Sequence, residues 1–211
     1  MLAAFVGALL LVVAVGSARA EPYLIDYDES LLVVRVYRAG VGSVFAHDHV
    51  VRATRWDGSL DVNEAPVALA VDVRVDVQGL EVDEPEMRER FGLDGVLSDD
   101  DRRKIRETML GPTQLDAAAH PEIRFRSSEI DRADGGFRVG GELTIHGVTQ
   151  RVVFPMQVER NGVELRARGA LRVKQSDFGI EPYSAMLGAV RNQDEIDLLF
   201  DVVARPLRAK R

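Results

Sequence analysis

The sequence predicts an all-β fold, an antiparallel barrel or sandwich of about eight strands. Three observations lead to this prediction. Apolar and polar residues alternate over much of the chain, turn-forming pairs such as Asn161-Gly162 separate the alternating segments, and a single charged stretch has helical character. Alternation with a period of two places one face of each strand against a shared interior, which a closed or double sheet supplies.

Residues 1–20 are expected to form a secretory signal peptide. Residues 2–16 are almost wholly Leu, Val, Ala, Phe and Gly, and Ser17-Ala18-Arg19-Ala20 follows as a small-residue cleavage pattern. The apolar run is shorter than the ~20 residues that a spanning helix needs. We expect a periplasmic or secreted protein with one barrel domain over 21–211 and no transmembrane segment after cleavage. An N-terminal anchor is the alternative, because no Lys or Arg precedes the run.

The clearest strand covers residues 67–77, where every odd position is Val or Leu and the even positions carry Ala, Asp and Arg. Such a long alternation is incompatible with a helix. Turn signals at Asp57-Gly58, Asn161-Gly162 and Gly188 bound other segments of this kind. Further strands are predicted at 31–38, 123–126, 142–145, 152–158, 165–174 and 196–202.

Residues 83–110 interrupt the alternation and predict one or two short helices inserted over about 84–110. Ser98 is a suitable N-cap, the three Asp residues after it complement the positive end of the helix dipole, and Gly111-Pro112 ends the helix. Only a few residues, Ile105 and Met109 among them, give this helix an apolar stripe. We therefore expect it to lie over the barrel, near a mouth.

Composition excludes several classes of function. The 211 residues carry 34 acidic and 27 basic side chains, a net charge of −7, whereas nucleic-acid binding depends on clustered Lys and Arg. The chain has no cysteine, which removes disulfides, thiolate metal sites and cysteine nucleophiles. It also lacks the Gly-x-Ser-x-Gly elbow of serine hydrolases. We expect no enzyme, no required cofactor and no nucleic-acid partner.

Several motifs resemble those of the YceI family of exported lipid-binding proteins. They are Gly-Glu-Leu-Thr-Ile-His-Gly-Val-Thr at 141–149, Ser-Asp-Phe-Gly-Ile at 176–180, His-Pro-Glu-Ile-Arg-Phe-Arg-Ser at 120–127 and Tyr-Leu-Ile-Asp at 23–26. The resemblance covers nearly all of the chain after residue 20. It implies a lipocalin-like barrel of eight antiparallel strands around an elongated apolar tunnel. It further implies a polyisoprenoid ligand, such as a quinone tail or a prenyl phosphate, and a role as carrier or buffer.

Two segments depart from the family pattern. The stretch 83–101 is longer and more charged than the usual loop, and Phe-Ala-His-Asp-His at 45–49 introduces a His-x-His pair. The sequence leaves open whether the barrel forms a homodimer. It also leaves open, for any single apolar position, whether the side chain contacts lipid or only packs in the core. The expected tunnel residues are Val34, Val36, Val71, Val73, Val75, Phe125, Leu143, Ile145, Phe154, Met156, Leu171, Val173, Phe178, Leu198 and Phe200.

The histidines support an alternative function, a metal-binding module or metal-dependent enzyme centred on His47 and His49. Two histidines at this spacing on a strand project from the same face. They could hold Zn, Fe, Mn or Cu if a neighbouring strand supplied a third ligand, with His146 or His120 as the candidates. A polar cluster at the barrel mouth, bonded to backbone, Asp48 or a ligand head group, is the competing interpretation.

Overall fold

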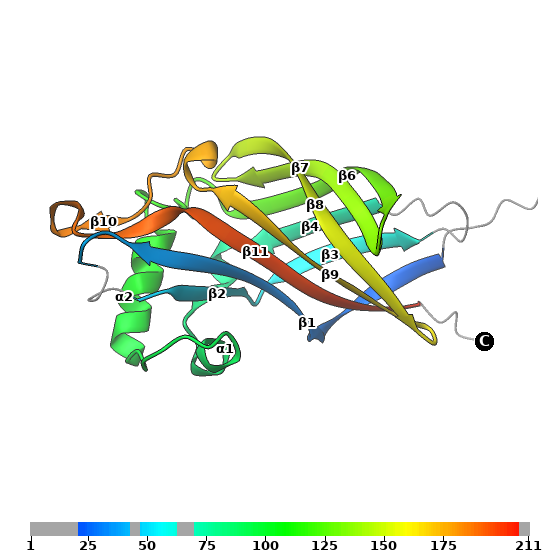
Figure 1. The fold of residues 1–211 in the computed structure, drawn as a ribbon, viewed down its shortest axis with the longest axis horizontal. Helices are drawn as coiled ribbons and strands as arrows, with labels where there is room; N and C mark the ends of the chain where they lie inside the picture. Colours follow the sequence, from blue (N-terminus) through cyan, green and yellow to red (C-terminus); the bar gives the residue numbers. More distant parts are fainter. Residues whose placement is uncertain (1–20, 43–46, 63–69, 207–211) are drawn as a thin grey trace, which may run out of the picture.

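The computed structural model describes residues 21–42, 47–62 and 70–206, and its strands form one curled antiparallel sheet (Figure 1). The predicted signal peptide and the first residues of the predicted strand 67–77 lie outside the described residues. The sheet closes on itself because its first strand pairs with its last over a long register, from Tyr23 opposite Pro206 to Ala39 opposite Arg191.

Eight strands complete the ring, and each is antiparallel to its neighbours. A lipocalin-like barrel, as predicted, is therefore confirmed. In ring order the strands are β1 (Glu21–Ala39), β3 (Trp56–Val62), β4 (Ala70–Asp76), β6 (Glu122–Ala133), β7 (Gly136–Ile145), β8 (Val148–Asn161), β9 (Glu164–Lys174) and β11 (Val190–Pro206).

Three shorter strands bring the sheet to eleven: β2 (His49–Ala53), β5 (Leu80–Val82) and β10 (Ser184–Ala185). The first two arise because two long strands bend at the same level. One bends at Thr54 and Arg55, and its neighbour bends at the 3₁₀ turn Val77–Gly79. The Thr54 N–H donates to the Gly79 carbonyl (2.8 Å), and the Asp76 N–H donates to the Arg55 carbonyl (3.0 Å). These bonds keep the bent strands together where the regular ladder breaks.

The insertion contains two helices, α1 (Pro85–Arg90) and α2 (Asp99–Leu110). Both ends of α2 are as predicted, since the Ser98 hydroxyl accepts a hydrogen bond from the Asp101 N–H (3.1 Å) and Gly111 is the C-cap. The helix lies against β5, where the Arg106 guanidinium donates to the Leu80 carbonyl (2.8 Å). It therefore covers a sheet edge that would otherwise expose unpaired backbone groups.

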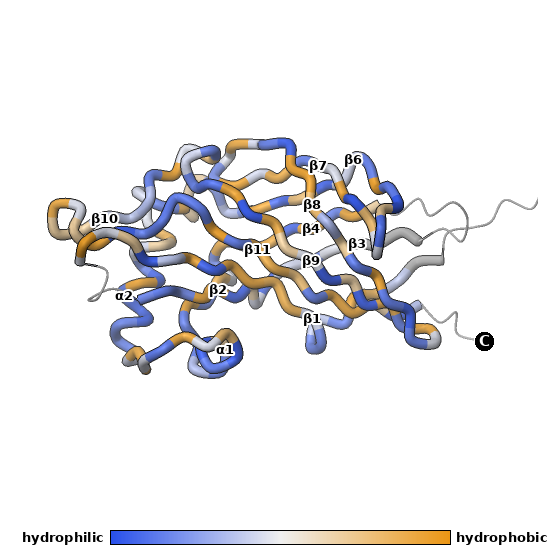
Figure 2. The backbone as a smooth tube through the Cα atoms, in the orientation of Figure 1, coloured by the Kyte–Doolittle hydropathy of each residue, from blue (hydrophilic) through white to orange (hydrophobic). Residues whose placement is uncertain are grey.

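The two faces of the sheet differ in chemistry. Apolar side chains face the interior, and arginines and carboxylates form cross-strand ion pairs outside, so hydrophobic and hydrophilic residues alternate along the tube in Figure 2. Asp72 accepts hydrogen bonds from Arg124 (2.7 Å) and Arg126 (3.3 Å), and the bond from Arg124 holds the pKa of this carboxyl below its ordinary value. Among the described residues, no helix is long and apolar enough to span a membrane.

Candidate functional site

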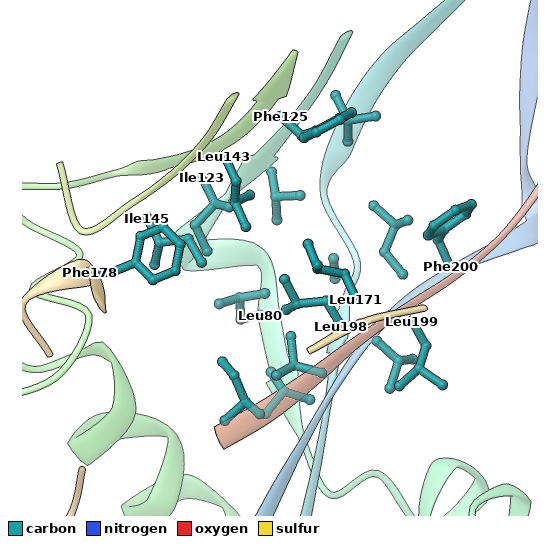
Figure 3. Close-up of a pocket in the computed structure, with 18 of the residues that line it drawn as sticks. Leu80, Ile123, Phe125, Leu143, Ile145, Leu171, Phe178, Leu198, Leu199 and Phe200 are labelled. Carbon is teal, nitrogen blue, oxygen red and sulfur yellow. The ribbon is translucent and has the colours of Figure 1, made fainter. Parts of the chain in front are cut away.

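The ring of strands encloses an apolar cavity of about 260 Å³. This volume lies just below the range of ~300–1,000 Å³ that is typical of small-molecule sites. Figure 3 shows the cavity between Phe178 at one end and Phe125 and Phe200 at the other. Antiparallel register builds the lining, because Val73 lies opposite Phe125 and Phe125 lies opposite Leu143, with all three side chains on the inner face.

The structure brings the predicted tunnel residues together. All of them except Val173 line this cavity. Val173 is 8% exposed and belongs to the same core cluster as the lining residues Phe178 and Ile180. Whether the lining residues contact a lipid stays a prediction.

Sequence reasoning missed a second group of lining residues. Leu32 could have been found, because it continues the alternation of Val34 and Val36 along β1. Ile123 could likewise have been found, because it alternates with Phe125 along β6. Several further lining residues lie on short strands, on α2 or on the loop after it, where no long alternation marks the inner face. They include Val51, Ala53, Leu80, Met109 and Leu115.

Three aromatic rings close one end of the cavity. The ring of Phe154 lies between Phe125 and Phe200, with centroid separations of 5.3 Å and 5.7 Å. Two glycines leave room for this cluster. A Cβ on Gly169 would lie 2.4 Å from Cζ of Phe200, and a Cβ on Gly141 would lie 2.7 Å from the ring of Phe125. The glycines therefore allow bulky rings to face inward on neighbouring strands.

Two glutamines are the polar lining residues at the end near α2. The amide nitrogen of Gln175 donates to the Gln193 carbonyl (2.8 Å), and that of Gln114 donates to the Glu181 carbonyl (3.0 Å). Each side-chain amide thus donates to a backbone carbonyl. No charged side chain lines the cavity among the residues that the structure describes. The cavity can therefore accommodate an apolar, uncharged ligand, and its described lining offers no partner for a buried charge.

The histidine pair does not have the predicted arrangement. Strand β2 begins at His49, so His47 precedes the strand and is exposed, whereas the His49 side chain is 19% exposed. The prediction of two imidazoles on one strand face is wrong for this reason. His49 Nδ1 instead donates to Oδ2 of Asp83 (2.6 Å).

Asp83 is the centre of a buried polar network that connects β2 to α1. Its carboxylate also accepts hydrogen bonds from the Val50 N–H (3.1 Å) and the Arg88 guanidinium (2.9 Å). Burial alone would raise the pKa of Asp83, but the bonds from His49, Val50 and Arg88 together hold it below the ordinary value. Arg88 also donates to the carbonyls of Asp48, Asp94 and Gly95. The network fastens the inserted segment to the barrel.

His146 lies elsewhere, in the two-residue turn between β7 and β8. His146 (φ 51°) and Gly147 (φ 72°) are both left-handed, as a type I′ hairpin requires. The ring of His146 packs against that of His120, with centroids 4.5 Å apart. Within the described ranges, no group of three or more His, Asp or Glu side chains could hold a metal ion. The described part of the chain thus shows no ligand set for the metal-site alternative.

Comparisons with known proteins support the barrel fold. The YceI-like domain family matches residues 23–204, and no curated protein matches the chain. The crystal structure of BcnA from Burkholderia cenocepacia aligns with a TM-score of 0.64 at 21% identity, covering 85% of this chain and 99% of that one. A Campylobacter jejuni YceI protein aligns with a TM-score of 0.57 at 14% identity, covering 75% and 85%. This chain therefore belongs to the YceI-like domain family.

Proposed function

We propose that this protein is an exported carrier or buffer that holds the tail of a long isoprenoid lipid inside its barrel. The observation that supports the proposal is the lining of the cavity, which is apolar except for Gln114 and Gln175. A slender hydrocarbon chain satisfies such a lining without leaving a polar group buried and unpaired. The signal-like segment at 1–20 supports export to the periplasm or the medium.

Apolar contact alone can supply the affinity. Burial of one five-carbon isoprene unit contributes at most ~4 kcal/mol, at ~0.8 kcal/mol per buried carbon. Association costs ~4–15 kcal/mol in lost freedom of motion. Three or four buried units therefore offset this cost, with no requirement for a specific polar contact.

The same lining restricts the head group. A phosphate inside the cavity would lack a cationic partner among the described lining residues, and burial of an unpaired charge is costly. A quinone tail fits the proposal directly. A prenyl phosphate fits only if its phosphate stays in water while the prenyl chain enters the barrel.

A pair of matched substitutions tests the proposal. Val73 lines the cavity, whereas Val153 on β8 is 50% exposed on the outer face. We expect Val73→Phe to weaken binding of radiolabelled geranylgeraniol by at least about tenfold, because the added ring occupies the lumen, and Val153→Phe to leave binding unchanged. Thermal unfolding of both variants confirms that they are folded. Equal binding by the two variants, or no binding by the original chain, would refute the proposal.

A further inference from the structure

Two adjoining turns form an apolar surface at one end of the molecule. The turn after β1 carries Val41, and the turn between β10 and β11 carries Met186 and Leu187. The Gly42 N–H donates to the Ala189 carbonyl (2.8 Å) and joins the two turns. Figure 2 shows hydrophobic colour on the turn beside β10. We call Val41, Met186 and Leu187 the apolar tip.

The side chains of the apolar tip contribute almost nothing to the core. Val41 is 96% exposed, Met186 is 75% exposed and Leu187 is fully exposed. Met186 (φ 51°) and Leu187 (φ 55°) also lie in the left-handed region, which bulky residues rarely adopt. The Met186 and Leu187 side chains are thus exposed to water on a strained backbone, and they pack little against the described part of the chain. This combination indicates a contact outside the chain.

We propose that the apolar tip docks the protein on a phospholipid bilayer. A standard protein interface involves roughly 20–30 residues a side, far more than three protruding aliphatic side chains supply. Such side chains instead suit shallow insertion at the boundary between head groups and acyl chains. Tyr183 lies just behind the tip, where its carbonyl accepts a hydrogen bond from the Asn192 N–H (2.9 Å), and it is 40% exposed. Tyrosine is enriched at this depth of a membrane.

The charges beside the tip are mixed. Glu181 precedes the turn and Arg191 follows it, and both are exposed. Apolar insertion rather than attraction to anionic lipid therefore drives docking, and added salt should weaken it little. The tip and α2 lie at the same end of the barrel (Figure 1), and Met109 of α2 lines the cavity. Docking by the tip brings this end of the cavity to the membrane, although the docking itself requires no ligand in the cavity.

The absence of cysteine allows a site-specific test. Leu187→Cys and Val163→Cys, each labelled with the environment-sensitive dye NBD, are mixed with phosphatidylethanolamine–phosphatidylglycerol vesicles. Val163 is the matched control, because it is 59% exposed in the turn between β8 and β9, at the opposite end of the barrel. We expect a blue shift and an intensity rise for the label at 187 and no change at 163. An unchanged signal at 187, or the same change at both positions, would overturn the proposal.

Flotation of unlabelled protein with the same vesicles checks the result without a dye. The Met186→Ser/Leu187→Ser variant should float about tenfold less than the original chain, at low and at high salt. If the original chain does not float, or the variant floats equally well, the bilayer proposal is wrong. These vesicles contain no isoprenoid, so the result is independent of whether the cavity binds one.

Discussion

Phe154→Ala should lengthen the cavity at its aromatic end. The Phe154 ring is 8% exposed and lies between the rings of Phe125 and Phe200. Its removal costs about 3–5 kcal/mol of unfolding free energy, as is typical for a buried Phe→Ala change. Part of this cost is the loss of two aromatic pairs, each worth about 0.5–1.5 kcal/mol. Urea unfolding followed by fluorescence of Trp56, the only tryptophan in the chain, measures the loss.

The same substitution should change which ligand the barrel prefers. The space released by the ring admits more of a prenyl chain, and one additional isoprene unit is worth up to ~4 kcal/mol. The ratio of the Kd for farnesol to the Kd for geranylgeraniol should therefore rise, as measured by competition against a radiolabelled prenol. Phe137→Ala is the matched control, because Phe137 packs against the same core without lining the cavity. An unchanged ratio in Phe154→Ala, or an equal rise in Phe137→Ala, would show that this ring does not end the ligand site.

Three further substitutions test the framework around the cavity. Because the pKa of Asp83 is held below its ordinary value of 3.8, its stabilising effect is complete above that pH and is lost as the pH falls through the lower value in the folded protein. Asp83→Asn should reduce this acid-side loss and cost about 3–5 kcal/mol at neutral pH, since Arg88 stays buried without its carboxylate; an acid slope equal to that of the original chain, in unfolding curves at several pH values, would contradict this. Gly169→Ala should cost about 1–3 kcal/mol, because its methyl group would collide with the Phe200 ring, and an unchanged Tm would contradict that steric argument. Ser98→Ala should remove the N-cap of α2 and cost about 1 kcal/mol, with faster amide exchange confined to the first turn of the helix; uniform exchange along α2 would count against a local effect.

Residue periodicity predicted the inner face of the barrel because long strands repeat every second residue. Val71, Val73 and Val75 all line the cavity, as their alternation indicates. The ends of α2 were equally predictable, since Ser98 and Gly111 act through their immediate neighbours. These features depend on local chemistry alone, which a single sequence displays directly.

Other features depend on tertiary contacts and could not be predicted from the sequence. The bend at Thr54 and Arg55 is held by hydrogen bonds to the neighbouring strand, so no local signal marks it. Leu115 lines the cavity from a loop without periodicity. His49 binds Asp83, more than thirty residues away in the sequence, and His47 lies before the strand. The spacing of the two histidines gave no indication of that long-range partner.

Native mass spectrometry of the protein, purified from its own cells without detergent, tests the central claim most directly. The account predicts a population heavier than the bare chain by the mass of one isoprenoid lipid. Solvent extraction should remove this increment, and added geranylgeraniol should produce a new one in the original chain but not in Val73→Phe. A bare chain alone, with no increment after geranylgeraniol is added, would contradict the claim that the barrel holds an isoprenoid chain.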